Sequence, residues 1–394
     1  MKIAFVVQRY GLEVNGGAEL LARWLAEHLL KYFDIDIITT TAMDYNTWKP
    51  HYPEGKSEIN GVTIHRFNVS KPRNMFYFDL LSKFVFHLGH PAFLEKAWMD
   101  AQGPYCPDMI EFIKKNYDNY DIFLFITYLY AHTHMGLPAA EGKVVLIPAA
   151  HDEPPLRLSI FKDVFRIPSG FIYNTIEEKE LLSRRFDVEE KPGIIAGVGI
   201  NLPDNVDPEI AFEKFPQLKG KDYIIFVGRV STSKDADVLV DYFLKFREET
   251  GREIYLVILG KGEMIVKEHP AIVLPGFVSE DEKFSFIKNA RALVNPSRFE
   301  SLSMVLLEAW LMETPVMVSG KCEVTRNQTV RSGGGLSFAD YDSFQEGLIQ
   351  ILDNREKAHE MGVSGRKYTE ENYSWQHIEE KISEFLKSIL KSFD

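Results

Sequence analysis

Residues 2–39, KIAFVVQRYGLEVNGGAELLARWLAEHLLKYFDIDIIT, contain two short apolar runs with an amphipathic stretch of helix length between them. The run Lys2–Val7 predicts a buried strand, and Asp34–Thr39 predicts a second one. Apolar residues recur at helical spacing within Gly17–Tyr32, so this stretch predicts a helix with one buried face. A strand, a helix and a strand in this order predict the β-α-β unit of a parallel sheet with helices on both faces.

This alternation continues, stops at a polar stretch and then starts again. The first half has further predicted strands at Val62–Phe67, Ile122–Ile126, Val144–Pro148 and Phe171–Tyr173. The polar, proline-containing stretch Asn201–Lys219 predicts a linker. The second half has predicted strands at Tyr223–Val227, Ile254–Leu259, Ile272–Leu274, Ala292–Asn295 and Val316–Ser319. We therefore expect an α/β protein with two doubly wound parallel-sheet domains, 1–200 and 201–372, that face each other across a cleft, followed by a helical pattern at 373–394.

Composition excludes several classes of protein. The 394 residues include 45 Lys and Arg against 57 Asp and Glu, a net charge of −12, which argues against nucleic acid as a partner. The two cysteines, Cys106 and Cys322, are too few for a disulfide framework or a thiolate zinc site. No apolar run reaches the ~18 residues that a membrane span needs. These observations predict a cytoplasmic protein.

The segment Arg298–Trp310, RFESLSMVLLEAW, predicts an anion site. A helix should begin near Ser301 or Ser303, and its first amide groups, around Leu302, would be free to bind a phosphate. Glu300 precedes this helix end and Glu308 lies about two turns inside it, so the carboxylates should stand about 12 Å apart. Glu308 is flanked by apolar residues and should need a polar partner.

Two cations follow the first predicted strand of the second half. Gly228 ends that strand and lets a ligand approach the backbone, and Arg229 and Lys234 come next. A guanidinium and an ammonium group at this point could neutralise a diphosphate leaving group.

Polar groups also collect after strands of the first half. Gly16 and Gly17 can expose amide groups to an anion, but the spacing around them is not the GxGxxG of a dinucleotide site. His151, Asp152 and Glu153 follow the strand at 144–148, where His151 could donate a hydrogen bond to a substrate oxygen.

Two aromatic segments interrupt the alternation. The polar loop Met43–Asn60 carries Tyr45 and Trp48, which could stack on acceptor sugars. Asn74–Leu88 is either a helix packed on the core or a surface for a lipid-like acceptor or a membrane.

We expect no metal site. The Asp34-Ile35-Asp36 pattern of metal-dependent transferases lies on a predicted buried strand. His132 and His134 would lie together only on a strand, and no third ligand is evident in the sequence.

Together these residues resemble the retaining glycosyltransferases of family 4, which have the GT-B fold, and the resemblance runs over nearly the whole chain. Glu300 and Glu308 match the family's E-x7-E motif, and Arg229 with Lys234 match its diphosphate-binding pair. The Gly16-Gly17 turn matches its N-terminal glycine loop, and the tail 373–394 resembles the helix that crosses back onto the first domain.

The resemblance implies a nucleotide-diphospho-sugar donor and no cofactor. Glu308 would hold the ribose, Glu300 the donor sugar, and His151 would lie near the transferred sugar. The remaining donor-binding residues would be Gly16, Gly17, Arg229, Lys234, Ser301, Leu302 and Ser303. Family members need no protein nucleophile. The chain departs from the pattern at Asp235 and Leu302, where the family commonly has glycine.

We therefore predict a retaining, metal-independent hexosyltransferase of polysaccharide biosynthesis that acts on a glycan or lipid-linked acceptor, with a peripheral contact to the inner face of the membrane. The acceptor would meet Tyr45, Trp48, Asp152 and Glu153. The alternatives are a nucleotide-sugar epimerase or sugar-phosphate synthase on the same fold, or a catalytically silent nucleotide-sugar-binding subunit.

Overall fold

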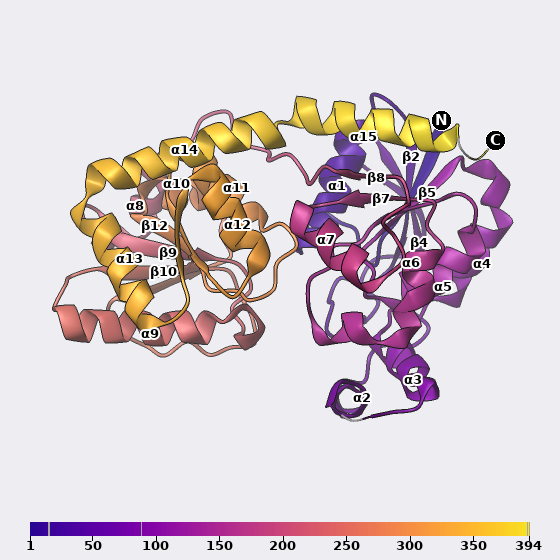
Figure 1. Cartoon of the computed structure of the whole chain (residues 1–394), viewed down its shortest axis with the longest axis horizontal. Coiled ribbons are helices and arrows are strands. Elements are labelled where there is room, and N and C mark those ends of the chain that lie inside the picture. The colour runs from indigo at the N-terminus through magenta and orange to yellow at the C-terminus, as the bar shows by residue number, and fades with distance from the viewer. Residues whose placement is uncertain (15, 88, 392, 394) are drawn as a thin grey trace. The chain divides into compact units, whose positions relative to one another are not determined.

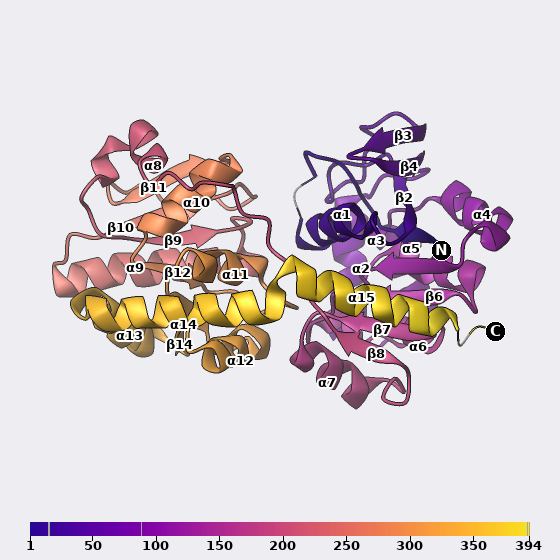
Figure 2. The same cartoon turned by 90° about the horizontal axis from the view of Figure 1, so that it is seen from above.

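The computed structural model describes residues 1–14, 16–87, 89–391 and 393. They form two compact units, the first made of Met1–Val198 with Trp375–Asp394 and the second of Gly199–Ser374 (Figures 1 and 2). The sequence predicted boundaries after residues 200 and 372. Asn15, Leu88, Ser392 and Asp394, which belong to segments discussed above, lie outside the described residues.

The first unit is built on an eight-stranded sheet in the order β3-β4-β2-β1-β5-β6-β7-β8. Its neighbouring strands pair in parallel, except that β3 and β4 are antiparallel. The central strands β5 and β6 are apolar and buried at every residue, as expected for a sheet covered on both faces. The strands are β1 (Lys2–Val6), β2 (Asp34–Thr40), β3 (Gly55–Ile59), β4 (Val62–Phe67), β5 (Ile122–Ile126), β6 (Val144–Ile147), β7 (Gly170–Tyr173) and β8 (Gly193–Ile195).

Helices cover this sheet, and the last helix of the chain is one of them (Figure 2). The helix α15 packs against α1 and β8 and buries Ile378, Ile382 and Leu386. Glu379 of α15 accepts a hydrogen bond from His28 of α1 at 2.8 Å. The helices are α1 (Gly17–Leu29), α2 (Met75–His87), α3 (Ala92–Gln102), α4 (Pro107–Lys115), α5 (Ala131–Gly136), α6 (Lys162–Arg166), α7 (Ile176–Arg185) and α15 (Trp375–Leu390).

The second unit has a six-stranded, fully parallel sheet in the order β11-β10-β9-β12-β13-β14. Its strands are β9 (Tyr223–Val227), β10 (Tyr255–Leu259), β11 (Ile272–Gly276), β12 (Ala292–Asn295), β13 (Val316–Ser319) and β14 (Gly335–Phe338). Its helices are α8 (Ile210–Lys214), α9 (Ala236–Thr250), α10 (Glu280–Asn289), α11 (Met304–Leu311), α12 (Glu323–Ser332), α13 (Tyr341–Asp353) and α14 (Arg355–Tyr373).

Three expectations about elements were wrong. The stretch 43–60 is not loop throughout, because β3 lies in it as an exposed edge strand with the polar sequence GKSEI. The predicted linker 201–219 contains the short helix α8. The C-terminal helix begins at Trp375, since Tyr373 still belongs to α14.

Among the described helices, none has both the length and the apolar character that crossing a bilayer requires.

Candidate active site

Each sheet has one point at which the strand order reverses, because the chain adds strands first on one side of the first strand and then on the other side. In the second unit β9 lies between β10 and β12, so the loops that follow β9 and β12 leave adjacent strands at the same edge. Ligands of open α/β sheets bind at such a switch point, outside the carboxyl ends of the strands. Most donor-binding residues predicted for this unit lie in these two loops, 228–235 and 296–303.

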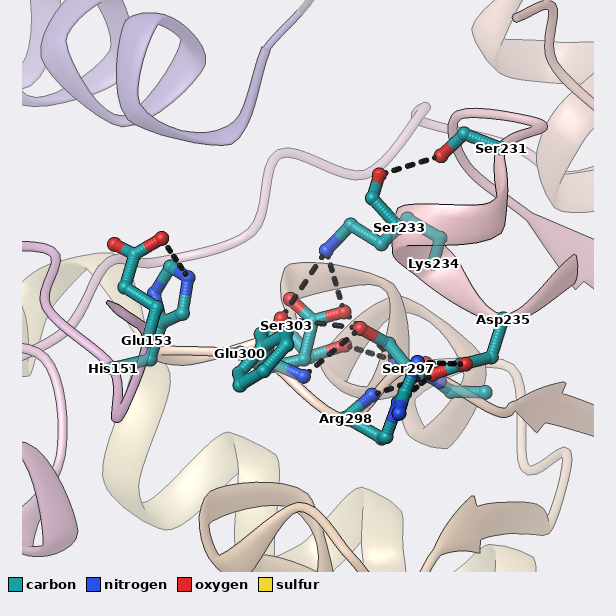
Figure 3. Close-up of polar contacts among 12 residues, drawn as sticks. His151, Glu153, Ser231, Ser233, Lys234, Asp235, Ser297, Arg298, Glu300 and Ser303 are labelled. Carbon is teal, nitrogen blue, oxygen red and sulfur yellow. Dashed lines mark hydrogen bonds and ion pairs between the residues drawn. The ribbon is translucent and has the colours of Figure 1, made fainter. Parts of the chain in front are cut away.

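Lys234 and Glu300 meet at this edge (Figure 3). Lys234 Nζ lies 2.8 Å from Glu300 Oε1 and 3.5 Å from the carbonyl oxygen of Phe299. The carboxylate is the more buried partner, with 15 % of its side chain exposed against 32 % for the lysine. A cation and a carboxylate are thus held within one contact at the switch point of this sheet.

The helix α11 begins at Met304, directly after Ser303. Ser303 adopts the left-handed conformation, with φ of 66°, and its Oγ accepts a hydrogen bond from Asn295 Nδ2 at 2.9 Å. The adjacent Leu302 is buried. The backbone conformation that favours glycine therefore belongs to Ser303 and not to Leu302, the position at which the family commonly has glycine.

Glu308 lies closer to the helix start than expected. It is the fifth residue of α11, a little over one turn inside rather than two. The side chain is buried, and Lys283 of α10 supplies the polar partner that its apolar surroundings require, with Nζ 2.8 Å from Oε1. Lys283 also binds Glu280 at 2.7 Å. Burial alone would lower the pKa of Lys283, but the two carboxylates outweigh it and raise that pKa.

Arg229 follows β9 directly after Gly228, and its side chain is partly exposed. Gly228 has a φ of 152°, and a Cβ on Gly260 would lie only 1.9 Å from the Gly228 carbonyl oxygen. The loops that follow β9 and β10 therefore pack backbone against backbone, which explains the glycines at positions 260 and 262.

In the first unit, Gly16 makes room for a buried ion pair. Arg9 Nη2 lies 2.6 Å from Glu19 Oε1, and Gln8 Nε2 donates to the same oxygen at 2.8 Å. A Cβ on Gly16 would lie 2.2 Å from Glu19 Oε2. Gly17 is exposed and begins α1. The pair Arg9–Glu19 had no signal in the sequence analysis.

His151 and Glu153 are in contact after β6 (Figure 3). His151 Nε2 lies 3.3 Å from Glu153 Oε2, and the Tyr128 hydroxyl donates to Glu153 Oε1 at 2.7 Å. Asp152 is directed to another partner, since it accepts a hydrogen bond from Arg185 Nη2 at 2.7 Å.

The buried carboxyl group of Glu178 holds the turn before His151. Ala149 has a φ of 49°, and Glu178 of α7 accepts hydrogen bonds from the backbone amides of Ala150 and Asn174, both at 2.6 Å. Burial raises the pKa of Glu178 to about 8. A Thr-x-x-Glu capping pattern at 175–178 was the sequence signal that could have drawn attention to this residue.

Trp48 is not available to an acceptor sugar. The side chain is fully buried, and its indole Nε1 donates to the Gln102 carbonyl oxygen at 2.7 Å. Tyr45 packs on the same small cluster with its side chain partly exposed. The expectation for Trp48 was wrong because the aromatic ring fills a core under the loop.

The discounted metal patterns have structural roles in the described residues. Asp36 binds Lys2 and Tyr120; burial opposes ionisation, but these contacts and one from His65 lower its pKa to about 2. His132 and His134 lie on α5 and not on a strand. Across the described ranges, no three His, Cys, Asp or Glu side chains gather as a metal site would need.

Comparisons with known proteins identify similar chains. Residues 207–368 match the family Glycosyl transferases group 1. The uncharacterized glycosyltransferase MJ1607 of Methanocaldococcus jannaschii is 25% identical over 96% of this chain and 96% of its own length. The capsular polysaccharide biosynthesis glycosyltransferase CapM of Staphylococcus aureus is 25% identical over 44% of this chain and 50% of its own.

Solved structures match both units. Sucrose-phosphate synthase from Thermosynechococcus elongatus superposes with a TM-score of 0.75 over 99% of both chains at 14% identity. Anabaena HepE in complex with UDP-glucose gives 0.70 over 98% of this chain and 100% of its own at 12% identity. The fold of two Rossmann-like parallel-sheet domains is therefore GT-B, which confirms the predicted fold class. Together, the comparisons support a glycosyltransferase.

Proposed function

We propose that the chain is a retaining, metal-independent glycosyltransferase that moves a sugar from a nucleotide-diphospho-sugar to a glycan or lipid-linked acceptor. The observation that carries this proposal is the contact of Lys234 with Glu300 at the switch point of the second unit. These are the two groups that a sugar diphosphate would meet on either side of the bond that breaks.

Charge stabilisation and positioning are the proposed sources of catalysis. Lys234, Arg229 and the amides at the start of α11 would stabilise the negative charge that grows on the leaving diphosphate. Glu300 would hold the sugar hydroxyls and Glu308 the ribose. His151, with Glu153 beside it, would contact the transferred sugar.

Uridine nucleotides are the first donors to test. HepE was solved with UDP-glucose, and an Escherichia coli trehalose-6-phosphate protein of the same fold was solved with UDP-2-fluoro-glucose. CapM, as its name states, belongs to capsular polysaccharide biosynthesis.

A ligand-binding panel tests the proposal. We expect UDP, GDP or ADP and one matching nucleotide sugar to raise the melting temperature, because a ligand bound to the folded state stabilises it. Lys234→Ala should weaken binding at least about tenfold, the loss of one charge-assisted contact. Lys219→Ala, which breaks the exposed pair with Glu209, should leave affinity unchanged. Binding that survives Lys234→Ala, or no binding at all, would contradict the proposal.

Transfer assays test the finer claims. The sugar should keep its anomeric configuration in the product, which NMR reads directly. Turnover should persist in EDTA, because the cations Arg229 and Lys234 would take the role of a metal. Inversion, or complete loss of activity with the chelator, would refute the corresponding claim.

We also propose that α2 and α3 contact a lipid-linked acceptor in its membrane. Leu81 and Val85 of α2 face the core. On the same helix Phe76 is 80 % exposed and Phe84 is 43 % exposed, and Phe93 of α3 is 69 % exposed. One face of α2 therefore packs on the core, and the proposed contact would use the exposed face. The replacements Phe76→Ser and Phe93→Ser should reduce co-sedimentation with anionic vesicles, whereas Val330→Ser, at a 74 % exposed site on α12, should not. Equal sedimentation of all three variants would reject the contact.

A further inference from the structure

Asp235 adopts a backbone conformation that glycine adopts more readily. It follows Lys234 directly, caps the start of α9 and has a φ of 52°. Aspartate is among the few residues that tolerate this left-handed region, although at some cost. A residue kept in this conformation is expected to contribute a side-chain interaction that glycine cannot make.

The side chain of Asp235 makes an ion pair and hydrogen bonds with Arg298 (Figure 3). Asp235 Oδ1 lies 2.9 Å from Arg298 Nη2, while Oδ2 accepts from Arg298 Nε at 3.0 Å and from its backbone amide at 3.2 Å. The carboxylate is only 8 % exposed, although half of the arginine side chain faces solvent. A two-pronged ion pair on a buried carboxylate holds geometry far better than an ordinary surface pair.

The contacts join the two loops that carry the site. Asp235 ends the loop after β9 and directly follows Lys234. Arg298 lies in the loop after β12, two residues before Glu300. The backbone amide of Arg298 is itself one of the donors, so the contact fixes main chain as well as side chain. The same two loops are therefore linked twice, by the Lys234–Glu300 contact at 2.8 Å and by the Asp235–Arg298 contacts.

We propose that Asp235 and Arg298 are positioning residues that set Lys234 and Glu300 in register for a sugar diphosphate. The proposal rests on the function proposed above, in which Lys234 binds the diphosphate and Glu300 the sugar. Only a ligand that carries both groups uses the spacing between the two loops. A nucleoside diphosphate uses the lysine without the carboxylate.

The test compares two ligands on the full chain. Asp235→Asn and Arg298→Gln should each weaken binding of UDP-glucose about tenfold while changing binding of UDP less than about threefold, in isothermal titration. If the panel selects guanosine, GDP-mannose and GDP replace this pair. Asp353→Asn is the matched control. Asp353 forms a two-pronged pair with Arg252 at 2.6 and 2.7 Å, just before the first residue of β10 and not at the carboxyl end of a strand. It should change neither affinity.

Two further variants separate positioning from simple stability. Asp235→Gly keeps the left-handed backbone without strain, so its melting temperature should equal or exceed that of the wild type while the selectivity for UDP-glucose is still lost. The double variant Asp235→Asn with Arg298→Gln should bind UDP-glucose no more weakly than the weaker-binding single variant, because the two single changes remove the same interaction.

The outcomes are distinct. If the wild type binds UDP-glucose and the variants change both affinities in parallel, or neither, the positioning role is refuted and the proposed function stands. If the wild type binds no nucleotide sugar, the proposed function fails and this inference fails with it.

Discussion

Lys283 is the residue on which the buried carboxylate of Glu308 depends. Its Nζ lies 2.8 Å from Glu308 and 2.7 Å from Glu280, and only 12 % of its side chain is exposed. A buried charge that loses its partner is costly, whereas an exposed pair contributes little. The contact therefore matters for stability as well as for the orientation of Glu308.

Lys283→Met should lower the free energy of unfolding by about 3 kcal/mol, since it leaves the buried Glu308 carboxylate without this cation. Urea denaturation measures the change. Lys214→Met provides the control: Lys214 lies on α8, pairs with Glu282 of α10 and is 70 % exposed, so its cost should stay below about 1 kcal/mol. Equal costs for the two variants would show that Glu308 does not rely on Lys283.

Glu178 should make stability depend on pH. Burial raises its pKa to about 8 in the folded chain, against 4.5 for an ordinary glutamate. Between these values the unfolded chain has released the proton and the folded chain retains it, so the free energy of unfolding falls as pH rises. Below about 4.5 the carboxyl is protonated in both states and the contribution is constant.

Replacing Glu178 by Gln should remove this dependence. Urea denaturation from about pH 5 to about pH 8 should show a slope smaller by up to about one proton than that of the wild type. Glu180→Gln, on the exposed side of the same helix, should keep the wild-type slope. A Glu178 variant with an unchanged slope would place the ionisation elsewhere.

At the residue scale, the sequence supports site positions better than it supports contacts. Glu300 and Lys234 stand out because each follows a strand end, and the structure brings them to 2.8 Å. Lys283 could not be paired with Glu308, since nothing in a sequence links two residues on different helices. Trp48 was misplaced because the same aromatic ring can fill a core or face a sugar.

At the scale of elements, the start of α1 depends on a glycine. Gly16→Ala should destabilise the first unit by about 1–3 kcal/mol, because its Cβ would collide with Glu19 in the buried pair with Arg9. Gly17→Ala places the same methyl group on the exposed first residue of α1, where alanine favours the helix and stability should be equal or higher. Thermal unfolding compares the two, and similar melting temperatures would mean that the ion pair adapts to the methyl group.

Elements were predictable where burial leaves a pattern. Apolar runs mark β5, β6, β9 and β12 because both faces of these strands are covered. The edge strand β3 has the exposed sequence GKSEI and no such pattern. The short edge strand β14 has only four residues and begins at the last of three successive glycines, so it has no long apolar run.

At the scale of the whole molecule, the first unit needs the last helix of the chain. A chain ending at Ser374 would lack α15 and expose the surface that Ile378, Ile382 and Leu386 cover. Hydrogen exchange should then rise throughout residues 1–198 while the second unit stays protected. A chain ending at Leu390 serves as the control and should exchange like the full chain. If residues 1–198 of the Ser374 truncation exchange at the same rates as in the full chain, the first unit does not depend on α15.

The doubled architecture was the most predictable property, because the strand-helix rhythm starts twice. Membership of α15 in the first unit followed only from resemblance, since an amphipathic pattern does not state which surface it covers.

The placement of α15 also sets an order of events during synthesis. The ribosome completes all of Gly199–Ser374 before the helix that finishes the first unit has emerged. Domains usually fold as units while the chain grows, but here the surface that α15 covers stays uncovered until translation of the later part has ended.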